Sequence, residues 1–354
     1  MSGKKRIGIL TSGGDCPGLN AAIRAVVHRA VLTYGWEVVG LEEGTQGLLS
    51  RPVRARTLDL NMVDGGVLRM GGTILGSTNK GDPFAYPMPD GTLKDRSGEI
   101  AEGCRQLGLE GLIAVGGDGS FAIMRKLAKV GNLKLVGIPK TIDNDIGLTE
   151  ISVGFDTAVA VATEALDRLQ PTAASHARVM VLEVMGRDAG HIALSAGIAG
   201  GADVILLPEI PWSVEGIAKK IREVKDNGRN FALVVVSEAV RTMEGAAARQ
   251  AFTDGQKRYG GIGNYVGHMI AEATGAETRV TVLGHVQRGS PPSPRDRLIA
   301  SAFGVHAVDL VVQGRFDRMV AWSNRGVIDV PLEQAIAAYH CVEKDSPLLN
   351  TARG

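Results

Sequence analysis

The densest group of acidic side chains in the sequence follows the apolar run Leu135–Ile138. Asp143 and Asp145 stand two residues apart, beside Lys140 and Thr141, in the segment PKTIDND. In extended backbone, residues two apart face the same side, so the two carboxylates would share one space. Like charges this close raise the pKa of one carboxyl unless a cation or hydrogen-bond donors intervene. The pair could therefore hold a metal ion or supply a general base, although a loop of Asx-turns would contain the same residue types.

Two glycine-rich segments, Thr11–Gly18 (TSGGDCPG) and Gly116–Ser120 (GGDGS), each follow a short apolar run. Glycines between a strand and a helix let backbone amides approach an anion at the helix N-terminus. Asp118, within the second segment, adds a carboxylate of the kind that holds Mg²⁺ beside bound phosphates. We interpret both segments as phosphate-binding turns. The alternatives are a turn with an aspartate cap and a helix capped by Ser120.

Basic side chains occupy two further segments, Met185–His191 (MGRDAGH) and Arg279–Ser290 (RVTVLGHVQRGS). Arg187 stands beside a glycine where a helix is predicted to begin, and a guanidinium at a helix N-terminus attracts anions. His285 and Arg288 stand just past the end of an apolar run. Arginine is a common ligand of phosphate esters, so both segments are candidates for ligand contact. The alternatives are a surface arginine and a structural histidine.

Short apolar runs alternate with helical patterns along most of the chain. The predicted strands are Ile7–Leu10, Val38–Leu41, Leu112–Val115, Leu135–Ile138, Val179–Val184, Val204–Leu207, Ala232–Val236 and Val280–Leu283. The predicted helices are Asn20–Tyr34, Ser120–Ala128, Thr157–Leu169, Val214–Lys225, Gly263–Ala273 and Leu298–Val312. This alternation predicts parallel βαβ units whose sheets are covered on both faces, with ligands at the carboxyl ends of the strands. Tyr86–Gly98 is predicted to be a surface loop, and the polar tail Glu343–Gly354 to be partly loose.

The composition bounds the class of protein. The 354 residues, 44% hydrophobic and 22% charged, suit a soluble globular protein of about two domains. With 39 basic and 38 acidic residues the net charge is +1, which excludes a basic field for nucleic acid. No run approaches the ~18 apolar residues of a membrane span. Three scattered cysteines, Cys16, Cys104 and Cys341, form no disulfide framework, so we expect a cytoplasmic location.

Two common nucleotide-binding fingerprints are missing from the sequence. It has no G-x-x-x-x-G-K-[ST] loop and no G-x-G-x-x-G, which argues against a P-loop protein and against a dinucleotide-dependent oxidoreductase. Instead, five segments in their order and spacing resemble the bacterial type of 6-phosphofructokinase. They are TSGGDCPGLNAAIR, GGDGS, PKTIDND, VLEVMGRDAGH and LGHVQRG. The resemblance runs from about Ile7 to Val320, nearly the whole chain.

The resemblance implies an architecture. It implies an α/β fold of two Rossmann-like three-layer lobes with mostly parallel sheets and an active site in the cleft between them. Residues 1–154 with 287–336 would form the lobe that binds the phosphoryl donor. Residues 155–286 with 337–354 would form the lobe that binds fructose 6-phosphate. The family also implies a homotetramer.

The resemblance further implies a reaction and its residues: the glycolytic transfer of a phosphoryl group from ATP to the 1-hydroxyl of fructose 6-phosphate, with Mg²⁺ as cofactor. Asp143 would be the general base, and Thr141 and Arg187 would stabilise the transferring phosphoryl group. The sugar-phosphate site would comprise Thr141, Ile142, Asp143, Arg178, Met185, Gly186, Arg187, Glu238, Arg279, His285, Val286, Gln287 and Arg288. Of these, Arg178 and Arg279 would act from a neighbouring subunit. The donor site would comprise Gly14, Lys80, Gly117, Asp118, Gly119 and Ser120, with Asp118 on Mg²⁺.

Three positions bear on the identity of the donor. Gly119 is typical of ATP-using members, where pyrophosphate users carry aspartate, whereas Lys140 is typical of pyrophosphate users. Where many ATP users have a Gly-Ser-Ala-Arg segment, this chain has GSTNK at positions 76–80, so a phosphate-binding arginine is lost and the neighbouring Lys80 is the candidate to replace it. An aspartate at position 119 would repel a nucleotide's α-phosphate, so Gly119 favours ATP, with pyrophosphate or ADP as alternative donors. A non-catalytic regulatory subunit of the same fold is a different class, and it would be expected to lack a residue such as Asp143.

Overall fold

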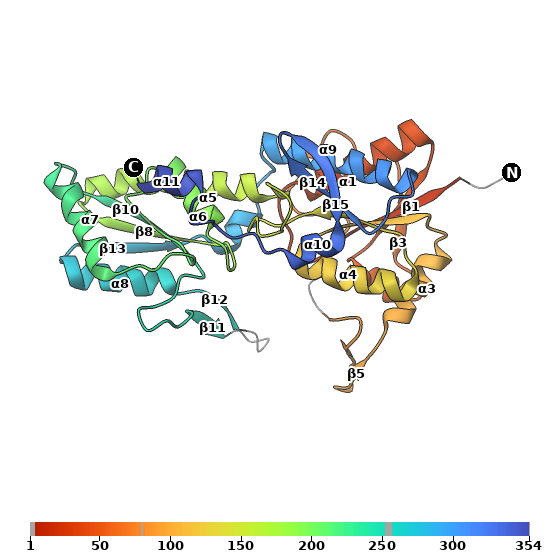
Figure 1. Cartoon of the computed structure of the whole chain (residues 1–354), viewed down its shortest axis with the longest axis horizontal. Helices are drawn as coiled ribbons and strands as arrows, with labels where there is room; N and C mark the ends of the chain where they lie inside the picture. The colour runs from red at the N-terminus through yellow and green to blue at the C-terminus, as the bar shows by residue number, and fades with distance from the viewer. Residues whose placement is uncertain (1–3, 79–80, 252–256, 354) are drawn as a thin grey trace. The chain divides into compact units, whose positions relative to one another are not determined.

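The computed structural model describes residues 4–78, 81–251 and 257–353, which divide into two compact units (Figure 1). Unit 1 comprises Met1–Thr141, Ile146–Asp156 and Arg288–Tyr339, and unit 2 comprises Ile142–Asp145, Thr157–Gln287 and His340–Gly354. The predicted division placed the four residues Ile142–Asp145 in the first domain. By their contacts they lie in unit 2, so the acidic segment is held by the second unit.

Unit 1 is built on a mostly parallel sheet with the strand order β15-β14-β7-β6-β1-β2-β3. The pairs β2–β3 and β14–β15 are antiparallel, and the other neighbouring pairs are parallel. Its strands are β1 (Arg6–Thr11), β2 (Glu37–Leu41), β3 (Ala55–Leu58), β6 (Gly111–Gly116), β7 (Leu135–Pro139), β14 (Arg318–Ser323) and β15 (Gly326–Pro331). Its helices are α1 (Leu19–His28), α2 (Thr45–Leu49), α3 (Ser97–Gln106), α4 (Asp118–Gly131), α9 (Pro294–Val312) and α10 (Leu332–Ala337). In Figure 1, α1 and α9 lie on one side of the sheet and α3, α4 and α10 on the other.

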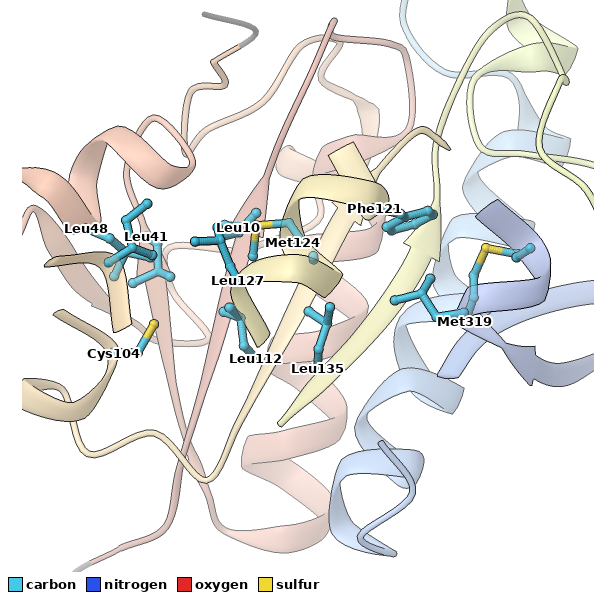
Figure 2. Close-up of a cluster of buried hydrophobic side chains, with 14 of the residues drawn as sticks. Leu10, Leu41, Leu48, Cys104, Leu112, Phe121, Met124, Leu127, Leu135 and Met319 are labelled. Carbon is cyan, nitrogen blue, oxygen red and sulfur yellow. The ribbon is translucent and has the colours of Figure 1, made fainter. Parts of the chain in front are cut away.

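The core of unit 1 explains why its strands are apolar throughout. All six residues of β6 are buried, because helices cover both faces of the sheet. On one face, α4 presents Phe121, Met124 and Leu127 to the sheet at the spacing of a helical stripe. Figure 2 shows these three side chains beside those of the sheet, among them Leu112 and Leu135. Burial of this stripe therefore fixes the helix whose first turn is a candidate phosphate site.

Unit 2 contains a second parallel sheet, with the order β13-β8-β10-β9. Its strands are β8 (Val179–Val184), β9 (Val204–Leu206), β10 (Ala232–Ser237) and β13 (Thr278–Val282). Its helices are most of α5 (Phe155–Ser175), then α6 (His191–Ala199), α7 (Val214–Asp226), α8 (Ile262–Thr274) and α11 (Pro347–Arg353). In Figure 1, α6 and α8 lie on opposite faces of this sheet. The fold class predicted from the sequence, α/β with two three-layer Rossmann-like lobes, is confirmed.

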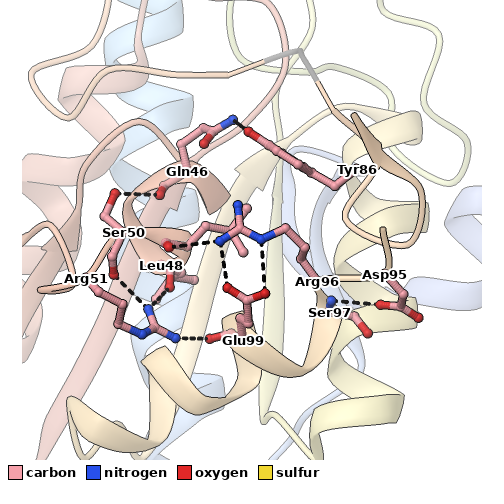
Figure 3. Close-up of polar contacts among 10 residues, drawn as sticks. Gln46, Leu48, Ser50, Arg51, Tyr86, Asp95, Arg96, Ser97 and Glu99 are labelled. Carbon is pink, nitrogen blue, oxygen red and sulfur yellow. Dashed lines mark hydrogen bonds and ion pairs between the residues drawn. The ribbon is translucent and has the colours of Figure 1, made fainter. Parts of the chain in front are cut away.

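Two segments are more ordered than predicted. Tyr86–Gly98 is not a plain loop, because it contains the short strands β4 (Tyr86–Pro87) and β5 (Leu93–Lys94). Its end opens α3, where Asp95 accepts a hydrogen bond from the Ser97 amide at 2.9 Å and Arg96 pairs with Glu99 at 2.6 Å (Figure 3). The Asp95 carboxylate thus satisfies the first amide of α3, and such a local polar contact leaves no apolar signal in the sequence.

The C-terminal tail is likewise structured, contrary to the prediction of a partly loose segment. It forms α11, which packs against α6 and buries Leu349. The first predicted helix, Asn20–Tyr34, is helical along its length, but α1 ends at His28 and a π-helical turn follows over Arg29–Thr33. Within residues 4–78, 81–251 and 257–353, no helix is both long and apolar enough to cross a membrane.

Candidate functional site

The two predicted glycine turns lie side by side in unit 1, because they follow neighbouring parallel strands. Thr11 at the end of β1 pairs with Val115 of β6, and the next amide, of Ser12, donates to the Val115 carbonyl at 3.0 Å. Gly13 has a φ of +83°, and a Cβ added to it would lie 2.9 Å from the Ser120 hydroxyl oxygen. Glycine is therefore required for the first turn to approach the second. The two segments come together as predicted.

The second turn leads directly into α4, whose N-cap is Gly117. The alternative of a cap by Ser120 is therefore wrong. Glycine has no side chain to occupy the first amides of the helix, and these amides together with the helix dipole favour an anion. Asp118 is the first residue of the helix. No described atom lies within 4 Å of a Cβ added to Gly119, so this turn faces open space.

Two cations surround the first glycine turn within unit 1. Lys140 is 4% exposed, and its ammonium group donates to the Gly14 carbonyl. The Arg288 guanidinium donates to the Asp15 carbonyl at 2.9 Å and lies 3.2 Å from a Cβ added to Gly14. Arg288, predicted from the resemblance for the sugar-phosphate site, thus contacts the glycine turn in this unit. The arrangement supplies positive charge and backbone amides to one small region, as a phosphate group requires.

The segment that precedes Lys80 also borders the first glycine turn. The Ser77 hydroxyl donates to the Gly13 carbonyl at 2.6 Å, and the Gly13 amide donates to the Thr78 carbonyl at 2.9 Å. Lys80 itself lies outside the described residues. Its role in the donor site therefore stays a prediction.

The two carboxylates of the acidic segment are buried in unit 2, with Asp143 6% and Asp145 2% exposed. The expectation of extended backbone between them is wrong, because Asn144 has a φ of +55° and the chain turns there. Each carboxylate acts on a different residue at the carboxyl edge of the unit 2 sheet. The Asp145 Oδ2 atom lies 3.7 Å from Nη1 of Arg187, and the charge of Asp143 helps to raise the pKa of Glu238. Tertiary packing, rather than strand geometry, thus brings the pair together.

The loop after β8 is tied to two side chains from distant parts of unit 2. Oε1 of Glu238 accepts hydrogen bonds from the amides of Gly186, at 3.2 Å, and Arg187, at 2.9 Å. Oε1 of Gln287 accepts from the Met185 amide at 2.8 Å. Arg187 has a φ of +52°, which is sparsely populated for a residue with a side chain, so these bonds hold a strained turn. Nε2 of Gln287 is buried and finds no hydrogen-bond partner among the described residues, which leaves a donor for a ligand.

The carboxyl of Glu238 is electrostatically perturbed. Burial raises its pKa to about 7, and the charge of Asp143 adds to this effect, while the two amide donors act in the opposite direction. Nothing in its residue type distinguishes Glu238 from other glutamates, and the sequence pointed to it through the family resemblance alone. A local signal does exist, because it follows a strand, β10, whose residues are all buried. A carboxyl at the carboxyl end of such a strand is placed where α/β sheets bind ligands.

The predicted intersubunit arginines lie together at the other end of the unit 2 sheet. Arg178 and Arg279 both pair with Glu277, at 2.8 and 2.5 Å. They stand at the amino ends of β8 and β13, whereas Met185 and Glu238 follow the carboxyl ends of β8 and β10. A strand of this length spans about 20 Å. Within one chain the arginines are therefore remote from the loop after β8.

His285 and Val286 follow β13 in the short 3₁₀ helix η3 (Gly284–Arg288), at the carboxyl edge of the sheet. This edge is the one that carries Met185 and Glu238. Val286 is 66% exposed. The position of both residues agrees with a ligand-binding edge, and their predicted contact with the sugar phosphate stays a prediction.

A divalent metal would find a limited set of protein ligands here. Among the described residues, no group of three or more histidine, cysteine, aspartate or glutamate side chains is arranged to hold a metal ion. Mg²⁺ does not require such a group, because it is usually bound by one or two carboxylates together with phosphate oxygens and water. Asp118, at the start of α4 beside the glycine turns, fits that mode of binding.

Parallel α/β units that carry glycine turns, cations and buried carboxylates at the ends of their strands are typical of enzymes acting on phosphorylated ligands. The family model described as phosphofructokinase matches residues 6–311, and the chain belongs to this family. It is 63% identical over 350 residues to ATP-dependent 6-phosphofructokinase 1 of Synechocystis sp., covering 99% of this chain and 97% of that protein. It is 46% identical to ATP-dependent 6-phosphofructokinase of Chloroflexus aurantiacus, with 99% and 97% covered.

Solved structures of phosphofructokinases have the same fold. The structure of Pichia pastoris phosphofructokinase in the T-state matches with a TM-score of 0.82 and 32% identity, covering 95% of this chain and 36% of that longer chain. The pyrophosphate-dependent phosphofructokinase of Nitrosospira multiformis matches with a TM-score of 0.79 and 23% identity, covering 98% and 90%. The second likeness concerns the fold alone.

Proposed function

We infer that the chain is an ATP-dependent 6-phosphofructokinase, which converts fructose 6-phosphate and ATP into fructose 1,6-bisphosphate and ADP. The observation that carries this conclusion is the 63% identity to an ATP-dependent 6-phosphofructokinase along 99% of the chain. The residues expected for phosphoryl transfer are all present, including Asp118, Asp143 and Arg187. A non-catalytic regulatory subunit would not be expected to keep them.

Unit 1 binds the donor. The amides of Gly14 and of Gly117–Ser120 hold the donor's phosphate groups, and the ammonium of Lys140 adds positive charge beside them. Asp118 would hold Mg²⁺ together with phosphate oxygens of the donor. When bound, the ion neutralises part of the charge on those phosphates. The open space beside Gly119 supports this role, since no atom of the residues that the structure describes, chain neighbours aside, lies within 4 Å of a Cβ added there.

Unit 2 binds the sugar phosphate and carries the base. Asp143 accepts the proton of the 1-hydroxyl as this oxygen attacks the terminal phosphorus of ATP, and Arg187 stabilises the charge on the transferring group with Thr141. The ion pair with Asp145 orients the Arg187 guanidinium. Glu238 and the amides around it hold the loop that begins at Met185 against the sugar. Positioning of reactants and catalytic groups in this way supplies much of the rate enhancement in enzymatic phosphoryl transfer.

A second copy of the chain completes the sugar-phosphate site. Arg178 and Arg279 are too far from the loop after β8 to reach a ligand bound there in the same chain. The two arginines would instead bind the 6-phosphate of fructose 6-phosphate in the site of a neighbouring subunit. We therefore propose at least a homodimer, and a homotetramer as in the family. A cytoplasmic location stays a prediction.

One experiment tests the function and the donor together. Initial rates are measured with purified protein, fructose 6-phosphate and Mg²⁺, and with ATP, ADP or pyrophosphate as the donor in separate reactions. We expect the highest kcat/KM with ATP. A higher value with pyrophosphate or ADP would overturn the assignment of the donor, and no turnover with any of the three would overturn the function.

A further inference from the structure

The C-terminal segment contacts the backbone of the acidic loop inside unit 2. The His340 amide donates to the Asp145 carbonyl at 3.0 Å, and Nδ1 of the His340 ring lies 2.9 Å from the Asn144 carbonyl oxygen. Because a carbonyl oxygen can only accept, Nδ1 carries the proton in this contact. One residue therefore fixes two consecutive peptide groups of the Ile142–Asp145 loop.

This loop depends on such contacts for its shape. It belongs to no helix or strand in the described structure, and Asn144 turns the chain with a φ of +55°, a left-handed conformation that asparagine adopts more readily than most residues with a side chain. The loop nevertheless carries Asp143 and Asp145, both buried. Irregular backbone keeps a side chain in place only as well as its hydrogen bonds do, and a misplacement of about 1 Å can reduce turnover by about 100-fold.

His340 is itself firmly held. Its ring packs against that of His191 with centroids 4.5 Å apart and the ring planes tilted by 36°, and Nε2 of His191 donates to the His340 carbonyl at 3.2 Å. His191 stands at the start of α6. Burial lowers the pKa of His191 to about 4, so its ring is neutral near pH 7 and adds no charge beside the acidic loop. The His340 ring thus lies between the start of α6 and the Ile142–Asp145 loop.

A second anchor lies two residues further along the chain. Oε1 of Glu209 accepts hydrogen bonds from the amides of Gly190, at 2.9 Å, and Val342, at 3.0 Å. The segment then forms α11, which packs on α6 with Leu349 buried. The C-terminal segment is therefore bound to the same helix end at several points and cannot easily move away from the acidic loop.

We propose that His340 is a positioning residue for catalysis, because its ring and amide hold the backbone that carries Asp143. The proposal rests on the proposed function, in which Asp143 is the general base. It assigns a catalytic purpose to the C-terminal segment beyond the match to the family model, which ends at residue 311.

Two isosteric amides give the sharpest test. The side-chain amide nitrogen of His340→Asn can take the place of Nδ1, whereas the amide of His340→Gln lies one carbon further out, near Nε2. We expect His340→Gln and His340→Ala to lower kcat by about 10- to 100-fold with the KM for ATP nearly unchanged. We expect His340→Asn to stay within about threefold of the wild type. The matched control is His268→Ala on α8, an exposed histidine, which should leave kcat unchanged.

The outcomes separate this proposal from the function on which it rests. Equal kcat values for the Asn and Gln variants, or a wild-type kcat for His340→Ala, would overturn it. If the Ala variant does not fold, the Asn and Gln pair still decides the question. Asp143→Ser is assayed in parallel. Loss of turnover there with a wild-type kcat in His340→Ala refutes the positioning role alone, whereas turnover retained in Asp143→Ser refutes the proposed base.

Discussion

The charged form of Glu238 should destabilise the folded protein, and the size of this effect can be worked out. Burial and the charge of Asp143 raise the pKa of this carboxyl from 4.5 to about 7. An acid whose pKa is raised on folding binds more protons in the folded state, so stability falls as the pH rises from the unfolded to the folded pKa. Because one pKa unit corresponds to about 1.4 kcal/mol, the loss of stability between about pH 5 and about pH 8 is about 2.5 kcal/mol.

The substitution Glu238→Gln removes the charge and keeps the oxygen that accepts from the Gly186 and Arg187 amides. At about pH 5 the variant should be nearly as stable as the wild type, because the wild-type carboxyl is then protonated when folded. At about pH 8 it should be more stable by about 2.5 kcal/mol, or by roughly 3 °C in Tm for a chain of this length. Thermal unfolding without ligands at the two pH values measures the difference.

The matched control is Glu215→Gln on α7, which removes an exposed carboxylate instead of a buried one. This prediction is refuted if the gain in stability of Glu238→Gln over the wild type is the same at both pH values. It is also refuted if the variant is the less stable protein at about pH 8. Either result would mean that the folded protein stabilises the ionised carboxyl in spite of its burial.

Three further predictions concern catalysis. Asp143→Ser should lower kcat by roughly 10²–10⁴-fold in a coupled assay, because a positioned base is lost, and near wild-type turnover would contradict this. Arg279→Ala should mainly raise the KM for fructose 6-phosphate, because a contact with the phosphate is lost. Mixing this variant with Asp143→Ser should restore activity in hybrid oligomers. If subunits are shown to exchange and no activity returns, Arg279 does not act across subunits. An aspartate side chain fits at position 119 without steric clash. Gly119→Asp should nevertheless lower kcat/KM for ATP by about 30- to 1000-fold, because the new carboxylate repels the phosphates of ATP. Unchanged kinetics with ATP would refute this.

Much of the fold could be predicted because its strands are buried on both faces. Such strands are continuous apolar runs in the sequence, and the predicted strand Val179–Val184 coincides with β8. The antiparallel pair β14 and β15 was missed, since β15 is only partly buried and has no continuous apolar run. The helix α11 was missed because its contribution to the core is small, with Leu349 as its buried residue. Partly exposed elements leave a weak pattern, so tertiary contacts decide them.

The places of the glycine turns and of the acidic segment can be predicted from the amino-acid order alone, because each follows its strand directly and short-range chain geometry places it at a sheet edge. The residues that these segments contact depend on the packing of distant parts of the chain. The bond from the Arg187 amide to Glu238 joins residues 51 positions apart, and that from the His340 ring to Asn144 joins residues 196 apart. The left-handed turn at Asn144 also overrides the extended backbone that the spacing of the two aspartates suggested. Local patterns record which strand a residue follows, whereas the partners of a loop depend on how distant strands and helices pack, and no local pattern records that.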